Sequence, residues 1–305
     1  METFDLHILG CGSAKPTSRH MPTCQVIEAR GKLYMIDCGE AAQMAFNRQG
    51  LKMNRLGHIF ISHNHGDHVF GLPGLISTMA LLGRTAELHI HAPKQLKAFI
   101  DLITDIYCQD IGYQILFHEV DTTTHQIIFE DRTLEVWSLP LQHRIPCCGF
   151  LFKEKPSLPH IRREMIDAYE IPLSQINNIK AGASWTTADG TVIPHEKLTT
   201  PSYPPRSYAY CSDTLYLPHL TEFVKGVNLL FHEATYPESM LARAKETCHS
   251  TAAQAARMAK DAEAKKLCIG HYSGRIKNEK AHLDEATTIF KSTILAAEGK
   301  TIHIE

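Results

Sequence analysis

Short apolar runs that end on a histidine or an aspartate recur along the chain, and this pattern limits the folds open to it. The run "HIFIS" leads directly into His63, and similar runs lead into His143, Asp213 and His271. Apolar runs of this length, bounded by turn residues, predict buried strands. A side chain at the end of a buried strand is held by rigid backbone. We therefore expect these four segments to bring their polar side chains to one common rim.

Helical patterns alternate with the apolar runs in both halves of the sequence. Strands are predicted at residues 4–10, 23–29, 32–39, 58–62, 87–93, 114–120, 125–131, 133–143, 147–154, 207–213, 227–235, 266–274 and 300–305, and helices at residues 40–50, 71–83, 94–107, 250–264 and 280–297. A hairpin is expected at "RGK", between the second and third strands, and Gly50 is expected to end the first helix. Many strands with interspersed helices favour two sheets packed face to face with helices outside. The predicted fold class is α/β, as one four-layer αββα sandwich.

Residues 153–206 interrupt this alternation. The segment is dense in proline, as in "PSLPH" and "PSYPPR", and one short helical stretch is predicted near residues 160–169. A long proline-rich segment between regular elements is typical of a surface insertion. We therefore predict a single domain over residues 1–305 with an inserted arm at residues 153–206.

The composition excludes some classes of protein. The formal net charge is −2, so the chain does not hold nucleic acid through its overall charge. No apolar run approaches the roughly 18–20 residues that span a bilayer, and "METFDLHILG" lacks the regions of a signal peptide. We therefore expect a cytoplasmic protein that makes no membrane contact. The nine cysteines include no C-x-x-C pair, which disfavours a disulfide framework or a cysteine-rich zinc module.

The segment "HNHGDH" carries the strongest chemical signal. His63 and His65 are two positions apart, so an extended backbone turns both to one side, and Gly66 allows a sharp turn that brings back Asp67 and His68. Imidazole and carboxylate are ligands for zinc and similar ions. Two metal ions, roughly 3.5–4 Å apart, would use four such groups better than one ion. The alternative is an exposed polar loop with incidental histidines.

The other strand-end residues each have an ordinary alternative, since Asp213, for example, could cap a helix that begins at "TLYLPHL". Together with the cluster they complete a set of seven candidate metal ligands, namely His63, His65, Asp67, His68, His143, Asp213 and His271. His89 and His91 are also two apart, but they lie in mid-strand with no carboxylate nearby. A structural role is the better interpretation of that pair.

The sequence resembles the metallo-β-lactamase superfamily, whose signature H-x-H-x-D-H is present as "HNHGDH". Within it, "FHEAT" followed by "CHST" is similar to the ribonuclease Z family, the tRNA 3′-processing endoribonucleases, and "LGCGSAKPT", "IDCGE", "PLQH", "YCSDT" and "GHYSGR" extend the similarity over nearly the whole chain. The resemblance implies a metallo-β-lactamase sandwich that removes 3′ trailers from precursor tRNA and leaves a 3′-hydroxyl. It also implies two Zn²⁺ ions per subunit and a homodimer.

The resemblance further assigns the ligands of each ion. One zinc ion would be held by His63, His65 and His143, the other by Asp67, His68 and His271, with Asp213 bridging the two. Five neutral imidazoles and two carboxylates leave about one positive charge on two zinc ions even with a bound hydroxide, which favours a phosphodiester anion.

The resemblance gives three residues a role in catalysis. Asp67 would orient the attacking hydroxide and accept its proton, and His249 would protonate the departing 3′ oxygen. Glu233 would pair with His249. Histidine suits this task because its pKa lies near neutrality, and a carboxylate partner fixes its tautomer and holds it charged. The alternative for Glu233 and His249 is an ordinary surface ion pair.

Three further residues lie beside the predicted ligands. Ser273 and Arg275 follow His271, and Thr214 follows Asp213, so all three could bind a phosphate of the substrate. Capping of the strand ends is an equally good interpretation of these residues.

The inserted arm lies where the family carries the exosite that grips tRNA. Its candidate contacts are Arg162, Arg163 and Lys180. Residues 153–180 contain five Lys or Arg and four Asp or Glu, so this part of the arm is nearly neutral. Because neutralised phosphates supply the salt-dependent part of nucleic-acid affinity, the arm offers few such contacts.

Two other functions remain open at this point. One is a related metallo-β-lactamase-fold hydrolase that acts on small phosphodiesters, lactones or thioesters, which the near-neutral arm favours. The other is a metal-stabilised RNA-binding or scaffold protein without turnover. The complete set of seven ligands and a candidate acid argue against the latter.

Overall fold

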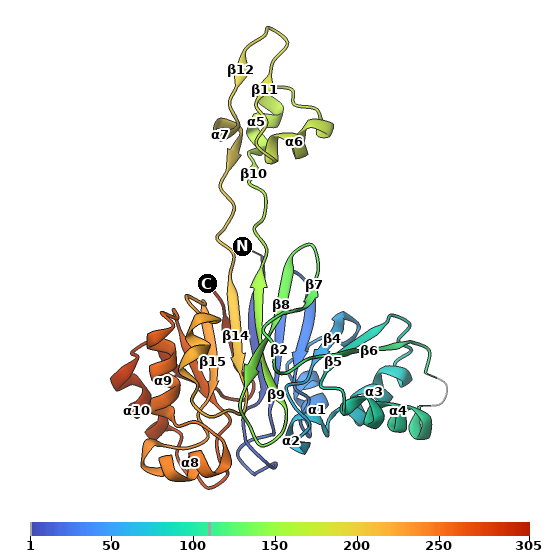
Figure 1. Cartoon of the computed structure of the whole chain (residues 1–305). Helices are drawn as coiled ribbons and strands as arrows, with labels where there is room; N and C mark the ends of the chain where they lie inside the picture. The colour runs from blue at the N-terminus through green and yellow to red at the C-terminus, as the bar shows by residue number, and fades with distance from the viewer. Residues whose placement is uncertain (1, 109–110) are drawn as a thin grey trace. The chain divides into compact units, whose positions relative to one another are not determined.

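Two seven-stranded sheets form the framework of the protein, shown in the computed structural model of Figure 1, which describes residues 2–108 and 111–305. The first sheet has the order β18-β1-β2-β3-β4-β5-β6. Its strands are β1 Phe4–Gly10, β2 Cys24–Ala29, β3 Lys32–Ile36, β4 Leu56–Phe60, β5 Leu88–Ala92, β6 Ile115–Glu119 and β18 Thr301–His303. A hairpin joins β2 to β3 at Arg30 and Gly31, which both have positive φ angles, as the "RGK" signal predicts.

The second sheet has the order β17-β16-β15-β14-β9-β8-β7. Its strands are β7 Ile127–Glu130, β8 Leu134–Leu141, β9 Cys147–Glu154, β14 Ser207–Cys211, β15 Leu229–Glu233, β16 Leu267–Gly270 and β17 Thr293–Leu295. Strands β14 to β17 are parallel, and their near-continuous apolar sequences agree with burial on both faces.

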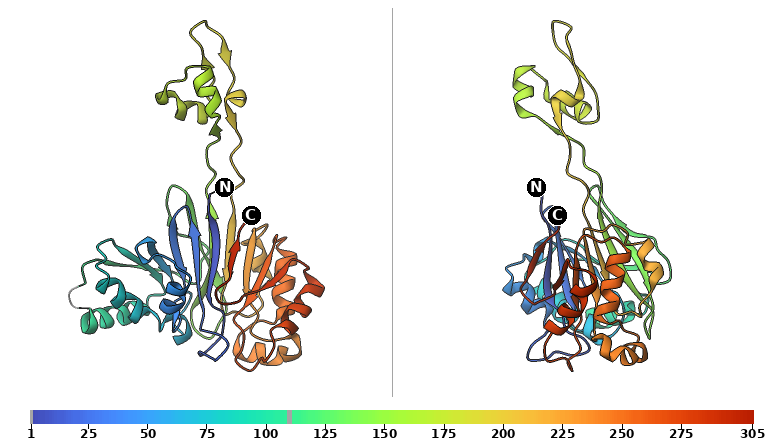
Figure 2. Two further views of the ribbon diagram at one scale, coloured as in Figure 1. Left: turned by 180° about the vertical axis from the view of Figure 1, so that it is seen from behind. Right: turned by 90° about the vertical axis from the view of Figure 1, so that its left-hand side faces the viewer.

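Helices cover the outer face of each sheet, which completes the predicted four layers (Figures 1 and 2). Helices α1 Ala42–Arg48, α3 Leu72–Leu81 and α4 Leu96–Tyr107 pack on the first sheet, and α9 Ala252–Asp261 and α10 Lys280–Ile289 pack on the second. Aromatic side chains fill the space between the sheets, where Phe60 lies 5.6 Å from Phe150 and 5.3 Å from Phe152 between ring centroids. Burying one such ring stabilises the fold by about 1.5–3 kcal/mol.

The structure corrects the sequence-based prediction of the last helix. Residues 280–297 were expected to be helical throughout, but α10 ends at Ile289 and residues 293–295 form β17, an edge strand parallel to β16. Tertiary pairing overrides local propensity here, because Leu267 donates a backbone hydrogen bond to Ser292. Gly50 does follow the first helix, with a φ angle of 68°, as predicted.

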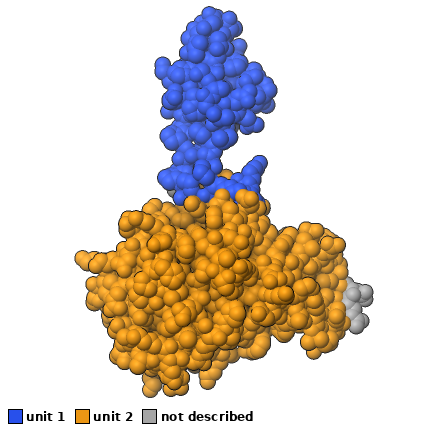
Figure 3. All heavy atoms as spheres, in the orientation of Figure 1, with its two compact units in different colours: residues 1, 131–134, 154–205 blue, residues 2–130, 135–153, 206–305 orange. Residues whose placement is uncertain are grey.

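The chain divides into two compact units, coloured separately in Figure 3. The smaller unit consists of residues 131–134 and 154–205 among those described. Its regular elements are β10 His160–Ile161, α5 Arg163–Ala168, α6 Ile176–Lys180, β11 Trp185–Thr186, β12 Val192–Ile193, α7 His195–Leu198 and β13 Thr199–Thr200. A small apolar core of its own, which includes Ile171, Ile179 and Leu198, holds these elements together. No helix among the described residues is long and apolar enough to cross a bilayer.

Candidate metal centre

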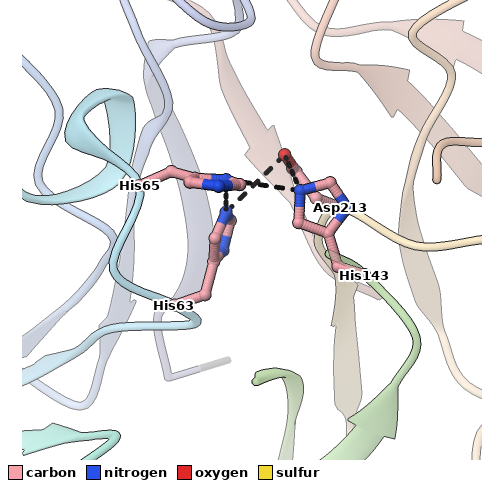
Figure 4. A group of neighbouring side chains, drawn as sticks. All are labelled: His63, His65, His143 and Asp213. Carbon is pink, nitrogen blue, oxygen red and sulfur yellow. Dashed lines mark hydrogen bonds and ion pairs between the residues drawn. The ribbon is translucent and has the colours of Figure 1, made fainter. Parts of the chain in front are cut away.

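Ends of strands from both sheets bring the predicted ligands together. His63 lies just beyond β4, His143 just beyond β8, Asp213 just beyond β14 and His271 just beyond β16. The expected common rim is therefore present, and Figure 4 shows His63, His65, His143 and Asp213 facing one another.

The first group consists of His63, His65, His143 and Asp213. The Nε2 atom of His63 lies 3.0 Å from Nδ1 of His65, and Nε2 of His143 lies 3.3 Å from the same atom. The Oδ2 atom of Asp213 lies 3.7 Å from Nε2 of His63 and 3.8 Å from Nε2 of His143. Ligands of one small cation are separated by distances of this size.

The second group consists of Asp67, His68 and His271, and Asp213 lies beside it too. The Oδ2 atom of Asp67 is 3.5 Å from Nε2 of His68 and 3.7 Å from Nε2 of His271. The other carboxylate oxygen of Asp213, Oδ1, lies 3.6 Å from Nε2 of His68 and 3.1 Å from Nε2 of His271. Asp213 therefore turns one oxygen to each group.

The turn after His65 differs from the expected one. Gly66 was expected to provide a sharp turn, but it begins the short helix α2 Gly66–Val69, and Asp67 and His68 lie in its first turn. A side chain at position 66 would collide with the ring of Phe70, since a Cβ atom there would lie 2.3 Å from that ring. Gly66 has no positive φ angle, and Phe70 is exposed, so its ring could move aside for a larger residue at this position.

Burial and charge together favour a cation at these groups. Burial lowers the pKa values of His63, His65 and His143, so these imidazoles are neutral and available as ligands. Burial also opposes charge on His68, but the carboxylates of Asp37 and Asp67 outweigh it and raise the pKa of His68. The carboxylates around His68 therefore favour a positive charge at this place, either a proton on the ring or a metal ion bound to it.

A buried network behind His68 was not predicted from the sequence. Asp37 accepts hydrogen bonds from Nδ1 of His68 at 2.7 Å, from the Ser62 amide at 2.8 Å and from the Tyr210 hydroxyl at 2.6 Å. An imidazole held in this way is fixed in tautomer and orientation. Asp37 follows β3 directly, which matches the strand-end pattern of the other acidic residues, and it lies in the motif "IDCGE", but neither signal shows that it contacts His68.

Two further contacts fix the remaining imidazoles. The Thr235 hydroxyl lies 2.9 Å from Nδ1 of His271, and the backbone oxygen of Cys248 accepts a hydrogen bond from Nδ1 of His143 at 2.9 Å. In both rings Nε2 is left to face the cluster. Thr235 lies in the motif "FHEAT" and Cys248 in "CHST", but these motifs do not show which ring each residue contacts.

Glu233 and His249 form a pair beside the cluster. Nδ1 of His249 donates to Oε1 of Glu233 at 2.8 Å, and Glu233 is fully buried. The backbone amide of Thr214 and the hydroxyl of Thr235 also donate to this carboxylate, at 3.0 and 2.6 Å. Burial lowers the pKa of His249, but the charge of Glu233 and its hydrogen bond outweigh burial and raise the pKa to about 9. The surface ion pair considered above is thus excluded, because the carboxylate has no exposure to solvent.

A cleft of about 750 Å³ opens over these residues. Basic side chains line it, namely Lys15, Arg144, Arg243 and Arg275, and only Arg275 was among the predicted residues. Ser273 also lines the cleft. Thr214 does not, because its side chain is buried and its hydroxyl donates to the Leu215 oxygen and accepts from the Gln142 amide. A concave surface with several cations fits a polyanionic ligand.

The remaining candidates lie elsewhere. In the smaller unit Arg162 precedes α5 and donates to the Thr199 oxygen, Arg163 begins α5 and is exposed, and Lys180 ends α6. His89 and His91 lie on β5 in a stack of rings, where the centroid of His91 is 4.5 Å from that of Phe60. This placement agrees with the structural role expected for the pair.

The two packed sheets and their outer helices define a protein of the metallo-β-lactamase fold. A crystal structure of the metallo-β-lactamase fold protein YhfI from Bacillus subtilis has a TM-score of 0.70 at 15% identity and covers 99% of both chains. A family model described as "Anti-Pycsar protein Apyc1" matches residues 4–105.

Two more comparisons narrow the class. Ribonuclease Z of Bacteroides fragilis (strain YCH46) is 56% identical over 304 residues, which is 100% of both chains. The crystal structure of the short form of human tRNase Z (ELAC1) has a TM-score of 0.72 at 25% identity and covers 99% of both chains. The chain belongs to the ribonuclease Z family of metal-dependent endoribonucleases.

Proposed function

We propose that this chain removes 3′ trailers from precursor tRNA with two zinc ions per subunit and leaves a 3′-hydroxyl on the tRNA. His63, His65 and His143 would hold one ion, and Asp67, His68 and His271 would hold the other. Asp213 would contact both. The observation that carries the proposal is that the two oxygens of Asp213 face two separate groups of ligand atoms.

The residues present fit such ions. The Nε2 atoms of His68 and His271 are buried and face the carboxylates of Asp67 and Asp213, but among the described residues neither has a well-aligned hydrogen-bond partner, although both rings are held in place through Nδ1. A buried polar nitrogen without a partner is costly, and a metal ion would remove that cost. Nitrogen and oxygen donors suit zinc. When bound, the ions supply Lewis acidity, which lowers the pKa of water and stabilises the charge of a phosphate.

The cleft binds and positions the phosphodiester. Arg275 and Ser273 lie on its wall, where a guanidinium and a hydroxyl can hold a flanking phosphate. Lys15 and Arg144 also line the cleft and add positive charge to it. Association with a polyanion is therefore favoured although the whole chain carries a net charge of −2.

Asp67 orients the attacking water. The backbone amide of Ala14 donates to its Oδ2 atom at 2.7 Å, which fixes the carboxylate. Without a bound ion, burial opposes ionisation of Asp67, but the charge of His68 outweighs burial and holds the pKa of Asp67 well below the usual range; a bound cation would favour the ionised carboxylate in place of that charge. Asp67 is thus an ionised acceptor for a proton of the water. Since its basicity is low, it passes that proton on to solvent.

His249 supplies the proton that the departing 3′ oxygen needs. Its Nδ1–H is bound by Glu233, so Nε2–H is left to face the cleft. With a pKa near 9, the ring is protonated at neutral pH and acts as a general acid. Glu233 has no contact with the reacting atoms in this scheme and acts through His249.

Cleavage of a 3′-extended tRNA transcript tests the proposal. His65→Ala removes a ligand of one ion, so cleavage should fall by several orders of magnitude while the circular dichroism spectrum is kept. His219→Ala is the control, because this exposed histidine lies outside the cleft. Unchanged processing by His65→Ala, or by protein stripped of metal, would defeat the proposal.

The smaller unit is proposed to hold the body of the tRNA. Its candidate contacts are Arg162, Arg163 and Lys180. Arg162 directly precedes the short helix α5, Arg163 begins it, and Lys180 ends α6. The unit has its own apolar core, so it can present these residues on a rigid surface. Few positive charges mean a weak dependence of affinity on salt.

We further propose a homodimer that works in the cytoplasm. Large apolar side chains are exposed on α3, on α4 and just after α3, namely Leu81, Leu82, Leu102, Ile106 and Tyr107. Exposed apolar patches mark surfaces that bind other proteins. Sedimentation of the wild type and of Leu82→Glu tests this, since a monomeric wild type would contradict it.

A further inference from the structure

Outside the cleft, three potential ligands of different chemistry meet at the loop of residues 11–23. Cys11, His20 and Glu298 each place one ligand atom within 4.8 Å of the others. We propose that these three side chains hold an additional divalent ion of the zinc type. This ion would restrain the loop from which the backbone amide of Ala14 donates a hydrogen bond to Asp67.

The separations fit one tetrahedral ion. The Sγ atom of Cys11 lies 3.5 Å from Nδ1 of His20, and both carboxylate oxygens of Glu298 lie 3.2 Å from that nitrogen. Bond lengths of about 2.3 Å to sulfur and about 2.0–2.1 Å to nitrogen or oxygen, at tetrahedral angles, give about 3.6 Å for S···N and about 3.3 Å for N···O. The free protein therefore already holds the sulfur and nitrogen atoms, and the nitrogen and oxygen atoms, at separations close to those that binding requires. Water would complete the coordination.

The other ring nitrogen of His20, Nε2, is also held by a hydrogen bond. Nε2 of His20 donates to Oε1 of Glu279 at 3.0 Å. A carboxylate behind a histidine fixes its tautomer and raises its basicity as a ligand, an arrangement that accompanies metal-bound histidines in general. Arg19 donates to the same carboxylate at 2.6 Å, so Glu279 is itself held in place.

The charges balance for a divalent ion. A thiolate from Cys11 and the carboxylate of Glu298 offset the two positive charges of the ion. Cys11 is buried, and burial together with the charge of Glu298 raises the pKa of its thiol. Without a cation, Cys11 stays a thiol near the Ala296 oxygen, and His20 forms an ion pair with Glu298. The ion has to displace these contacts, so its affinity is lower than the donor set alone implies.

The position of the site gives it a consequence for the cleft. Cys11 and His20 lie near the two ends of the loop, and Glu298 comes from the segment between β17 and β18. Within this loop, the backbone amide of Ser13 donates to the backbone oxygen of Tyr272 at 3.1 Å. The backbone amide of Ala14 donates to the carboxylate of Asp67 at 2.7 Å. An ion that joins both ends of the loop to the framework restricts the segment that carries these donors.

Cobalt absorption tests the site without any substrate. A thiolate ligand gives Co²⁺ a near-ultraviolet charge-transfer band, whereas the candidate ligand atoms found in the cleft, among the residues that the structure describes, are nitrogen and oxygen. Wild-type protein loaded with Co²⁺ should show the band, and Cys11→Ser should lose it and bind one ion fewer per chain. Cys268→Ser is the matched control, because this buried cysteine lies near Cys11 and outside the ligand group. Cys147→Ser is a second control, since its Sγ atom lies 3.6 Å from Nδ1 of His63.

Two results would overturn the inference. One is a wild-type protein that saturates with Co²⁺ and shows no charge-transfer band. The other is a band that persists in Cys11→Ser. Glu298→Gln keeps the size of the side chain and covers the case in which Cys11→Ser fails to fold, since it should also lose the ion.

Amide exchange measures the effect on the loop. In metal-loaded protein, amides of residues 13–17 should exchange more slowly than in metal-loaded Cys11→Ser, whereas exchange in β14 should not differ. Equal exchange rates in this loop would refute its proposed fastening.

Discussion

Replacing Glu233 with glutamine removes the charge that holds His249 protonated while keeping nearly the same shape. The charge of Glu233 is the largest cause that raises the pKa of His249 to about 9, so in Glu233→Gln the pKa should fall to about 6.5. At pH 8 the protonated fraction of His249 is then about 90% in the wild type and about 3% in the variant, a loss of roughly 30-fold. At pH 6 both proteins are largely protonated, and their rates should differ by less than about twofold.

Single-turnover cleavage of a 3′-extended tRNA between pH 6 and 9.5, at equal metal content, measures this difference. Glu222→Gln serves as the control because Glu222 is exposed and lies outside the cleft. A ratio of wild-type to variant rates that does not change with pH would refute the role of His249 as the acid.

The same pair affects stability. The folded-state pKa of His249 lies above its unfolded value of about 6.5, so the stabilisation is complete below that pH and is lost as the pH rises through about 9. Thermal unfolding of the wild type and Glu233→Gln should therefore differ most at low pH and converge at high pH. A constant difference in Tm would contradict this linkage.

Three further predictions concern the surroundings of the cluster. Asp37→Asn should weaken metal binding about 10–100-fold in chelator competition, because it loosens His68, and unchanged affinity would contradict the role of the buried network. Deletion of residues 155–200 should abolish cleavage of tRNA but leave turnover of bis(p-nitrophenyl) phosphate; equal losses on both substrates would show that the arm is needed for folding. Arg275→Ala should raise KM for tRNA more than it lowers kcat, and a change in kcat alone would place Arg275 in the chemical step.

The strand-end pattern predicted the centre of the site because each ligand type recurs after an apolar run. His63, His143, Asp213 and His271 come from four distant segments, yet the rigid ends of buried strands place them on one rim. The four layers followed from the same alternation of strands and helices.

What the sequence did not predict depends on contacts between distant segments. Asp37 accepts a hydrogen bond from His68 directly and another from Tyr210 of the other sheet, and the motifs "IDCGE" and "YCSDT" do not show that these side chains meet. Likewise, β17 exists because an edge of β16 is available for pairing, while its own residues are compatible with a helix. Thr214, expected near a phosphate, instead supports Glu233 through its backbone amide.

Anomalous X-ray scattering at the zinc absorption edge, from crystals of the protein loaded with zinc, would test the central proposal most directly. We predict two peaks in the cleft, one among His63, His65 and His143 and one among Asp67, His68 and His271, with Asp213 between them. A single peak in the cleft, or two peaks that Asp213 does not separate, would contradict the two-metal centre.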